Sequence, residues 1–169
     1  MIRIVLAAAL LFSAHTMACA QGAPAEAVKE LAPTGKLRAA INYGNGVLAQ
    51  KGADGPQGIS ADLSRELAKR LGVPLAFVTF EAAGKVFEAV KDGGIDVMFI
   101  AIEPVRAAEI EFSPPYVLIE GTYMVPQDSA LKTVADVDRT GVRIAIGRGS
   151  AYDLYLTRTI KNAEIVRVR

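Results

Sequence analysis

Cysteine and histidine are almost absent from this sequence. Its 169 residues include one of each, Cys19 and His15, and both lie within the first twenty positions. Those positions have the form of a secretory signal peptide, so a mature chain that starts at Gln21 would contain neither residue type. This absence excludes a disulfide framework, a zinc site built from cysteine and histidine, and a catalytic nucleophile paired with histidine.

The first twenty residues contain the three parts of a signal peptide. Arg3 gives a basic start, Ile4–Phe12 forms a short apolar core, and Ala18-Cys19-Ala20 supplies a cleavage site of small residues. We therefore predict that residues 1–20 are removed and that the protein is exported. The alternatives are an uncleaved anchor, although the apolar core is short for a hydrocarbon layer of about 30 Å, and a lipoprotein attached through Cys19, although no leucine stands in the three residues before it.

Neither sign of charge is in excess, and later apolar runs are short. The sequence has 19 Lys and Arg residues and 18 Asp and Glu residues, and loss of Arg3 with the signal leaves 18 of each. A neutral chain without a basic stripe is not typical of nucleic-acid-binding proteins, so we expect no nucleic-acid partner. No apolar run after the signal reaches the length of a membrane span, so we expect no direct span in the mature protein.

Sequence signatures of cofactor and metal sites are also missing. Gly147-x-Gly149 could open a dinucleotide fingerprint, but Tyr152 stands where the third glycine belongs, and no G-K-[ST] phosphate loop occurs. The acidic residues Glu81, Glu88 and Asp92 have the spacing of solvated faces rather than of a metal cage. We therefore predict no cofactor and no metal site.

The first part of the chain alternates strand-like and helix-like segments. In order, it contains a loose Ala/Pro-rich leader with about one helical turn at residues 21–36, a strand at Leu37–Asn42, a loop at Tyr43–Gly58, a helix at Ser60–Leu71, a strand at Leu75–Phe80, a helix at Gly84–Asp92 and a strand at Val97–Ile102. This alternation predicts βαβ units and an α/β fold with a parallel sheet. The unbroken apolar run of the last strand is typical of a strand buried on both faces.

The segment Ser60–Leu71 has the clearest helical pattern. Ser60 is the expected N-cap, and Gly72 is the expected stop. Asp62 suits the positive end of the helix dipole. Its apolar face consists of Leu63, Leu67 and Leu71. Glu66 and Arg70 form an acid–base pair with i,i+4 spacing.

The pattern changes after Pro126. It predicts a polar helical connector at residues 127–141, a strand at Val142–Ile146, a helix at Ala151–Ile160 and a short strand at Ile165–Val168. The stretches GKLRAAI, from Gly35, and GVRIAI, from Gly141, are similar to each other. This similarity favours a second lobe that resembles the first.

Arg106 is the first candidate for ligand binding, because it follows the apolar run Val97–Ile102. In open parallel sheets, ligands bind beyond the carboxyl ends of the strands, and a guanidinium can hold a carboxylate with two parallel hydrogen bonds. Gly147-Arg148-Gly149-Ser150 joins a predicted strand to a predicted helix, whose first N–H groups attract anions. The alternatives are a surface ion pair between Arg106 and Glu109 or Glu103, and an ordinary strand-to-helix turn at residues 147–150.

From Gly35 to Leu156, the order and spacing of several segments resemble the bacterial extracellular solute-binding proteins of family 3, the periplasmic receptors of polar amino-acid ABC transporters. The matching segments are GKLRAAINYG, GISADLSRELAKRLGV, FEAAGKVFEAVKDGGIDVMF, IEPVRAAEIEFSPPYV and VRIAIGRGSAYDLYL. The resemblance implies an α/β periplasmic-binding-protein-like fold whose two lobes, each with a βα-type sheet, close on a ligand about a hinge. It places the first lobe at 37–117, a hinge strand at 118–126 and a partial second lobe at 127–169. Leu118–Val125 is the apolar run within the hinge strand.

The resemblance also implies the site residues and the partners. Arg106 would hold the α-carboxylate of the solute, an amino acid or a similar carboxylate, and an ABC transporter permease would be the protein partner of a periplasmic receptor. The other positions that match the family's site are Ala101, Phe99, Glu103, Ser150, Ala151, Asn42 and Tyr43. The hydroxyl groups common in the family at the positions of Phe99 and Ala101 are missing, although the Ala101 amide can still donate.

Three further expectations follow from the resemblance. The family's acidic residue for the ligand's ammonium group and its return strand would lie beyond Arg169, so we expect a truncated member with an incomplete second lobe. An enzyme on the same fold, similar to cyclohexadienyl dehydratases, is an alternative to a transport receptor, with Glu103 as the general acid. A sensor or adaptor lobe is the other alternative.

Overall fold

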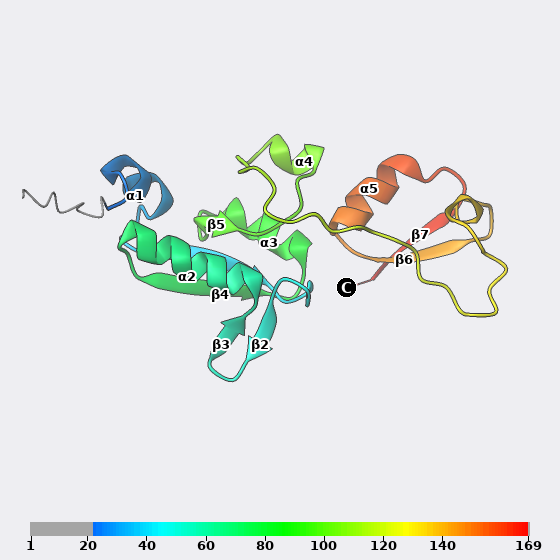
Figure 1. Ribbon diagram of the computed structural model, residues 1–169. Coiled ribbons are helices and arrows are strands. Elements are labelled where there is room, and N and C mark those ends of the chain that lie inside the picture. Colours follow the sequence, from blue (N-terminus) through cyan, green and yellow to red (C-terminus); the bar gives the residue numbers. More distant parts are fainter. Residues whose placement is uncertain (1–21, 169) are drawn as a thin grey trace, which may run out of the picture.

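The computed structural model describes residues 22–168 (Figure 1). The predictions for the signal peptide, for Gln21 and for Arg169 fall outside these residues. Helix α1, Ala25–Leu31, occupies the segment for which the sequence predicted a loose leader with about one turn. Its residues Val28 and Leu31 pack against the cluster around Leu37, so apolar contacts order this segment.

A three-stranded parallel sheet forms the centre of the first lobe. It consists of β1, Leu37–Asn42, β4, Leu75–Phe80, and β5, Val97–Met98, in the order β4-β1-β5. β1 pairs with β4 along its whole length but with β5 only at Ala39↔Val97 and Ala40↔Met98. The prediction of a strand over Val97–Ile102 is therefore wrong beyond Met98, because no partner backbone continues beside it in the described residues.

Two helices connect these strands and cover opposite faces of the sheet. Helix α2, Ile59–Leu71, precedes β4, and helix α3, Ala83–Val90, precedes β5. Alternate residues of β1 point to the two sides, since Leu37 and Ile41 pack on the side of α2 and Ala40 packs against Val86 of α3. The result is a three-layer α/β/α arrangement, and the predicted βαβ units and parallel sheet are confirmed.

Helix α2 differs in detail from its predicted pattern. Gly58, with φ +101°, occupies the N-cap position, and Ser60 is buried inside the helix, so its predicted capping role is wrong. Leu63 is exposed, while Ala61, Ser64 and Ala68 form the buried face with Leu71, because small residues let the helix lie close to the sheet. The Glu66–Arg70 pair, at 2.7 Å, and the left-handed Gly72 at the end of the helix are confirmed.

The segment predicted as a loop over Tyr43–Gly58 contains an antiparallel hairpin. Its strands are β2, Gln50–Gly52, and β3, Gly55–Gln57. The turn holds Ala53 and Asp54, and Asp54-Gly55 is a dipeptide that favours tight hairpins. The loop prediction was wrong because the glycines were interpreted as breakers rather than as turn residues.

The chain passes from the first lobe to the second in an irregular segment. Helix α4, Pro104–Ala107, follows β5, and residues 117–126 then form neither helix nor strand. The predicted hinge strand Leu118–Val125 is therefore wrong for the described residues. Leu118 and Met124 remain 87% and 97% exposed, because no neighbouring strand covers this apolar run.

A parallel two-stranded sheet and one helix form the second lobe. The elements are β6, Arg143–Gly147, α5, Ala151–Thr159, and β7, Glu164–Val168, which agree with the predictions within one residue at each end. The predicted helical connector at 127–141 contains only the 3-10 helix η1, Val134–Asp136, so that prediction is wrong over most of its length. The core of this lobe consists of Val137, Ile144, Ile146 and Leu156.

Among residues 22–168, none of the helices has both the length and the apolar character needed to cross a membrane.

Candidate functional site

Arg106 lies where the two lobes meet. It is the third residue of α4 and is 1% exposed. Its Nη1 donates to the Ala101 carbonyl at 2.9 Å within the first lobe, and its Nη2 donates to the Gly149 carbonyl at 2.9 Å in the second lobe. Its Nε is buried and has no hydrogen-bond partner among the described residues.

Within residues 22–168, the guanidinium of Arg106 therefore has neutral acceptors only. The surface-pair alternative is wrong, because Glu109 binds Lys91 at 2.7 Å and Glu103 binds Arg158 at 2.7 Å. Burial lowers the pKa of Arg106, and the nearby Glu103 carboxylate opposes part of this shift. An arginine remains charged in proteins, so this buried cation favours an anionic partner at its free edge.

The turn at residues 147–150 places the Gly149 carbonyl on Arg106. Gly149 has φ +69°, a conformation that glycine adopts without strain. Its N–H donates to the Asp153 carboxylate at 2.8 Å, which leaves its carbonyl directed to the first lobe. A Cβ on Gly84, at the start of α3, would lie 3.2 Å from the Gly149 Cα, so the two backbones approach as closely as two glycines allow.

Asp153 is a site residue that the sequence reasoning missed. It is buried and also accepts hydrogen bonds from Thr157 at 3.1 Å and from the Arg167 Nε at 2.8 Å. Burial acts to raise the pKa of Asp153, but the hydrogen bonds from Gly149, Thr157 and Arg167 outweigh it, so the pKa is below its ordinary value. The spacing Ser150-x-x-Asp153, a capping-box pattern, is the signal that could have revealed it.

Ser150 ends this turn and Ala151 follows it, but the hydroxyl of Ser150 is already engaged. It caps α5 by accepting a hydrogen bond from the Asp153 N–H at 3.2 Å. Ala151 is the first residue of α5. A ligand at this turn would therefore meet backbone groups before it met a free hydroxyl.

Glu103 stands at the N-cap of α4, and its carboxylate faces the second lobe. The residue is 9% exposed, and its Oε2 accepts a hydrogen bond from the Arg158 Nη1 at 2.7 Å. This ion pair engages the carboxylate with Arg158. The structure thus brings Glu103 near Arg106 but directs it to α5.

The remaining predicted site residues lie at the same edge of the first sheet. Asn42 ends β1 and accepts a hydrogen bond from the Gly44 N–H at 3.0 Å, while Tyr43 lies under the ammonium of Lys51, 5.2 Å from the ring centre. Phe99 packs edge-to-face against Tyr116 with ring centres 5.9 Å apart. Among the described contacts, none joins Asn42, Tyr43 or Phe99 to Arg106, so their ligand-binding roles stay predictions.

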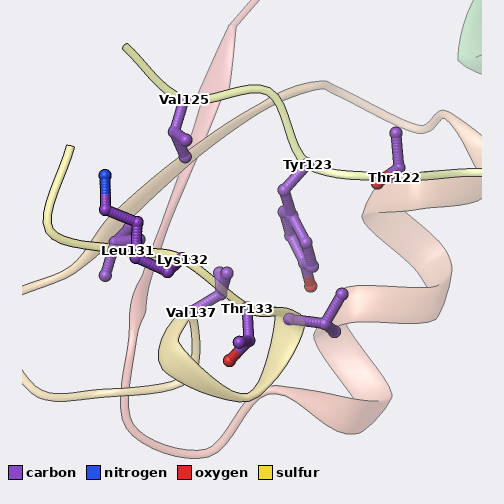
Figure 2. Close-up of a pocket in the computed structure, with 8 residues that line it drawn as sticks. Thr122, Tyr123, Val125, Leu131, Lys132, Thr133 and Val137 are labelled. Atoms are coloured by element: carbon purple, nitrogen blue, oxygen red, sulfur yellow. The ribbon is translucent and has the colours of Figure 1, made fainter. Parts of the chain in front are cut away.

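A pocket of about 140 Å³ lies elsewhere, in the second lobe (Figure 2). Segment 122–125 and η1 with the residues before it form its walls, and Tyr123 points into it. None of the predicted site residues lines this pocket. The residues that line it are Thr122, Tyr123, Val125, Leu131, Lys132, Thr133, Val134 and Val137. Within residues 22–168, histidine, cysteine and acidic side chains do not gather in any group of three that could hold a metal ion.

The architecture is that of the two-lobed periplasmic binding proteins. It consists of a parallel α/β lobe, an irregular segment that connects the lobes, and a second parallel α/β lobe that meets the first at a buried arginine. The sequence over residues 45–163 matches the family model of bacterial extracellular solute-binding proteins, family 3. The chain belongs to this family, which confirms the resemblance and the predicted fold class.

Solved structures support the same fold. The ancestral amino-acid-binding protein AncCDT-1, a precursor of cyclohexadienyl dehydratase, is 26% identical with a TM-score of 0.71, over 84% of this chain and 64% of that one. The arginine-bound form of truncated ArgBP from T. maritima is 23% identical with a TM-score of 0.62, over 79% and 64% of the two chains. The cysteine-binding protein from Campylobacter jejuni is 23% identical with a TM-score of 0.65, over 83% and 58%.

The chain therefore spans less than two thirds of the length of these solved receptors. None of the curated proteins matched the sequence.

Proposed function

We propose that this protein is the substrate-binding receptor of an ABC importer and that it captures a small carboxylate-bearing solute, an amino acid or a close relative, between its lobes. The observation that carries the proposal is Arg106, a guanidinium that is 1% exposed at the junction of the lobes and has no carboxylate partner among the described residues. Membership of the solute-binding family and the likeness to AncCDT-1 support an amino-acid ligand.

The hydrogen bonds of Arg106 suggest how a carboxylate would bind. Nη1 is fixed to the Ala101 carbonyl, while Nε is unpartnered in the described structure and Nη2 reaches the Gly149 carbonyl. Nε and Nη2 share one edge of the planar guanidinium, and this edge can hold both oxygens of a carboxylate. A solute would take this edge when the lobes separate, and its carboxylate would replace the Gly149 carbonyl.

The export and the partner follow from the same proposal. The signal-like residues 1–20 and the membership of the family support a periplasmic receptor, which would deliver the solute to an ABC transporter permease. A receptor needs no catalytic acid, and Glu103, the candidate acid of the enzyme alternative, is held in an ion pair with Arg158. We therefore infer a binding role rather than an enzymatic one, and product formation from prephenate or arogenate would contradict this inference.

The test is calorimetry on the chain with a panel of amino acids and related carboxylates, followed by substitution of Arg106. Arg106→Ala is expected to cost about 2–5 kcal/mol of binding, because it leaves the buried carboxylate unpaired. Arg106→Lys should recover little, since an ammonium cannot form the bidentate pair. Arg70→Ala, which removes an exposed arginine of α2, is the matched control.

Thermal unfolding of each variant would separate lost binding from lost folding. Binding by Arg106→Ala within about threefold of wild type, or ~0.7 kcal/mol, would show that Arg106 does not hold the solute.

A further inference from the structure

Helix α4 presents a second charged residue to the second lobe. Glu103 is the N-cap residue of α4 and precedes Arg106, within the helix, by three positions. The Glu103 Oε2 accepts a hydrogen bond from the Arg158 Nη1 at 2.7 Å, across 55 residues of sequence. This ion pair joins the first lobe to α5 of the second.

The position of Arg158 is fixed from its own side. Its Nη1 also donates to the Leu154 carbonyl at 2.9 Å, and its guanidinium lies 5.9 Å from the ring centre of Tyr155. Both neighbours belong to α5, so the helix holds the guanidinium in place before it meets Glu103. Less side-chain freedom is then lost when the pair forms.

The pair lies at the outer edge of the junction between the lobes. The side chain of Glu103 is 11% exposed and that of Arg158 is 41% exposed. Figure 1 shows α5 on the side of the second lobe that faces α3 and α4. A pair that is partly shielded from water contributes more than a fully exposed one, and separation of the lobes would return both charges to water.

Protein groups of both lobes contact each other directly at the junction. Besides the Glu103–Arg158 pair, these contacts include the hydrogen bond from Arg106 to the Gly149 carbonyl and the close approach of Gly149 to Gly84. A solute carboxylate would compete with the Gly149 carbonyl for Arg106, but it would not compete for Arg158. The two polar contacts therefore have different roles.

We propose that Glu103 and Arg158 form a latch that favours the closed arrangement of the lobes independently of the solute. A receptor with such a latch populates the closed form before binding. A solute can then bind only after the ion pair has broken and the lobes have separated. The inference goes beyond the proposed function, because it depends on the contact between the lobes and not on which solute Arg106 holds.

The experiment measures the distance between the lobes with no solute added. Spin labels are attached to cysteines introduced at the exposed positions Lys69, on α2, and Lys161, after α5, in the chain from Gln21, which has no native cysteine. Pulsed electron paramagnetic resonance then gives the distribution of distances. Glu103→Gln and Arg158→Gln are both expected to broaden it and to alter its mean.

Two further variants sharpen the experiment. The exchange Glu103→Arg with Arg158→Glu restores opposite charges and is expected to restore the wild-type distribution. Glu109→Gln breaks the exposed Lys91–Glu109 pair within the first lobe, 2.7 Å long, and is expected to leave the distribution unchanged.

Local folding is not expected to confuse the result, because the Glu103 side chain makes no capping hydrogen bond to α4. Circular dichroism melts of all variants check this directly. A wild-type distribution in both Glu103→Gln and Arg158→Gln would overturn the latch. Because no solute is present, this outcome is independent of whether Arg106 binds a carboxylate.

Discussion

The two lobes are stabilised in different ways. In the first lobe, Leu37, Ile41 and Ala61 are 0% exposed, since α2 and α3 enclose the sheet from both sides. The core residues of the second lobe, among them Ile144 and Ile146, retain 5–8% exposure around a two-stranded sheet. The first lobe therefore depends mainly on buried apolar area, and the second has less of it.

Aspartates compensate for the smaller core of the second lobe. The Asp138 carboxylate accepts hydrogen bonds from the backbone N–H groups of Lys161, Asn162 and Ala163, which tie the end of α5 to the chain before β6. Asp153 ties α5 to Arg167 of β7. The comparison shows that hydrogen bonds and ion pairs of carboxylates can supplement a small apolar core. Such interactions make the stability of the lobe dependent on pH.

The largest expected effect is on the apolar core. Ile41→Ala should lower the free energy of unfolding by about 3–5 kcal/mol, because the side chain is fully enclosed and a cavity would remain. Ile146→Ala in the second lobe should cost less, about 2–3 kcal/mol, because water can reach part of the site. Urea unfolding of both variants measures the difference, and an equal or larger cost for Ile146→Ala would contradict the comparison.

Acid is expected to act first on the second lobe. Hydrogen bonds from the Ala163 and Asn162 N–H groups lower the pKa of Asp138, and the bonds described above lower that of Asp153. An aspartate whose pKa is lower in the folded state than in the unfolded state stabilises the fold at pH values above its unfolded pKa of about 3.9. This contribution is lost as the pH falls from the unfolded pKa toward the folded pKa. As the pH is lowered, the backbone amides of β6, β7 and α5 should therefore lose protection from hydrogen exchange at a higher pH than the amides of β1 and β4.

A substitution tests the cause of this acid sensitivity. Asp153→Asn removes the charge that Arg167 binds and should cost about 2–4 kcal/mol at neutral pH, while it makes the stability of the second lobe less dependent on pH. Asp54→Asn, at the exposed hairpin turn, is the control. In the first lobe, the Asp96 carboxylate accepts a hydrogen bond from the Arg38 Nε at 2.9 Å. Simultaneous loss of protection in both lobes would indicate that they unfold as one unit.

The parts of the fold that have their own periodic pattern could be predicted from the sequence. The predicted strand Leu37–Asn42 matches β1, and the predicted helix Ala151–Ile160 contains α5, because local apolar spacing determines each of them. The apolar runs after Met98 and at Leu118–Val125 were predicted as strands and form none in the described residues. A strand requires a partner, and the sequence of one segment does not say whether a partner lies beside it.

The same limit applies to the site. The position of Arg106 after the third strand pointed to the edge of the sheet, where the structure places it. Its contact with the Gly149 carbonyl joins residues 43 positions apart, and the pair between Glu103 and Arg158 joins residues 55 positions apart. Contacts of this kind depend on how the two lobes sit against each other, which no local pattern encodes.

The smallest expected effects come from two glycines beside regular elements, one in each lobe. Gly72 closes α2 with φ +70°, and Gly141 precedes β6 with φ +88°, and an added Cβ would meet no atom within 4 Å at either position. Alanine at each should therefore cost only the conformational penalty, about 1–2 kcal/mol. Gly94→Ala, where space is also open and φ is not positive, is the control and should be close to neutral. Hydrogen exchange should show weaker protection only in the first lobe for Gly72→Ala and only in the second lobe for Gly141→Ala, because each lobe has its own core. A loss of protection in both lobes of either variant, spreading across α4, would contradict this expectation. It would mean that the inter-lobe contacts, and not the two separate cores, determine the stability of the chain.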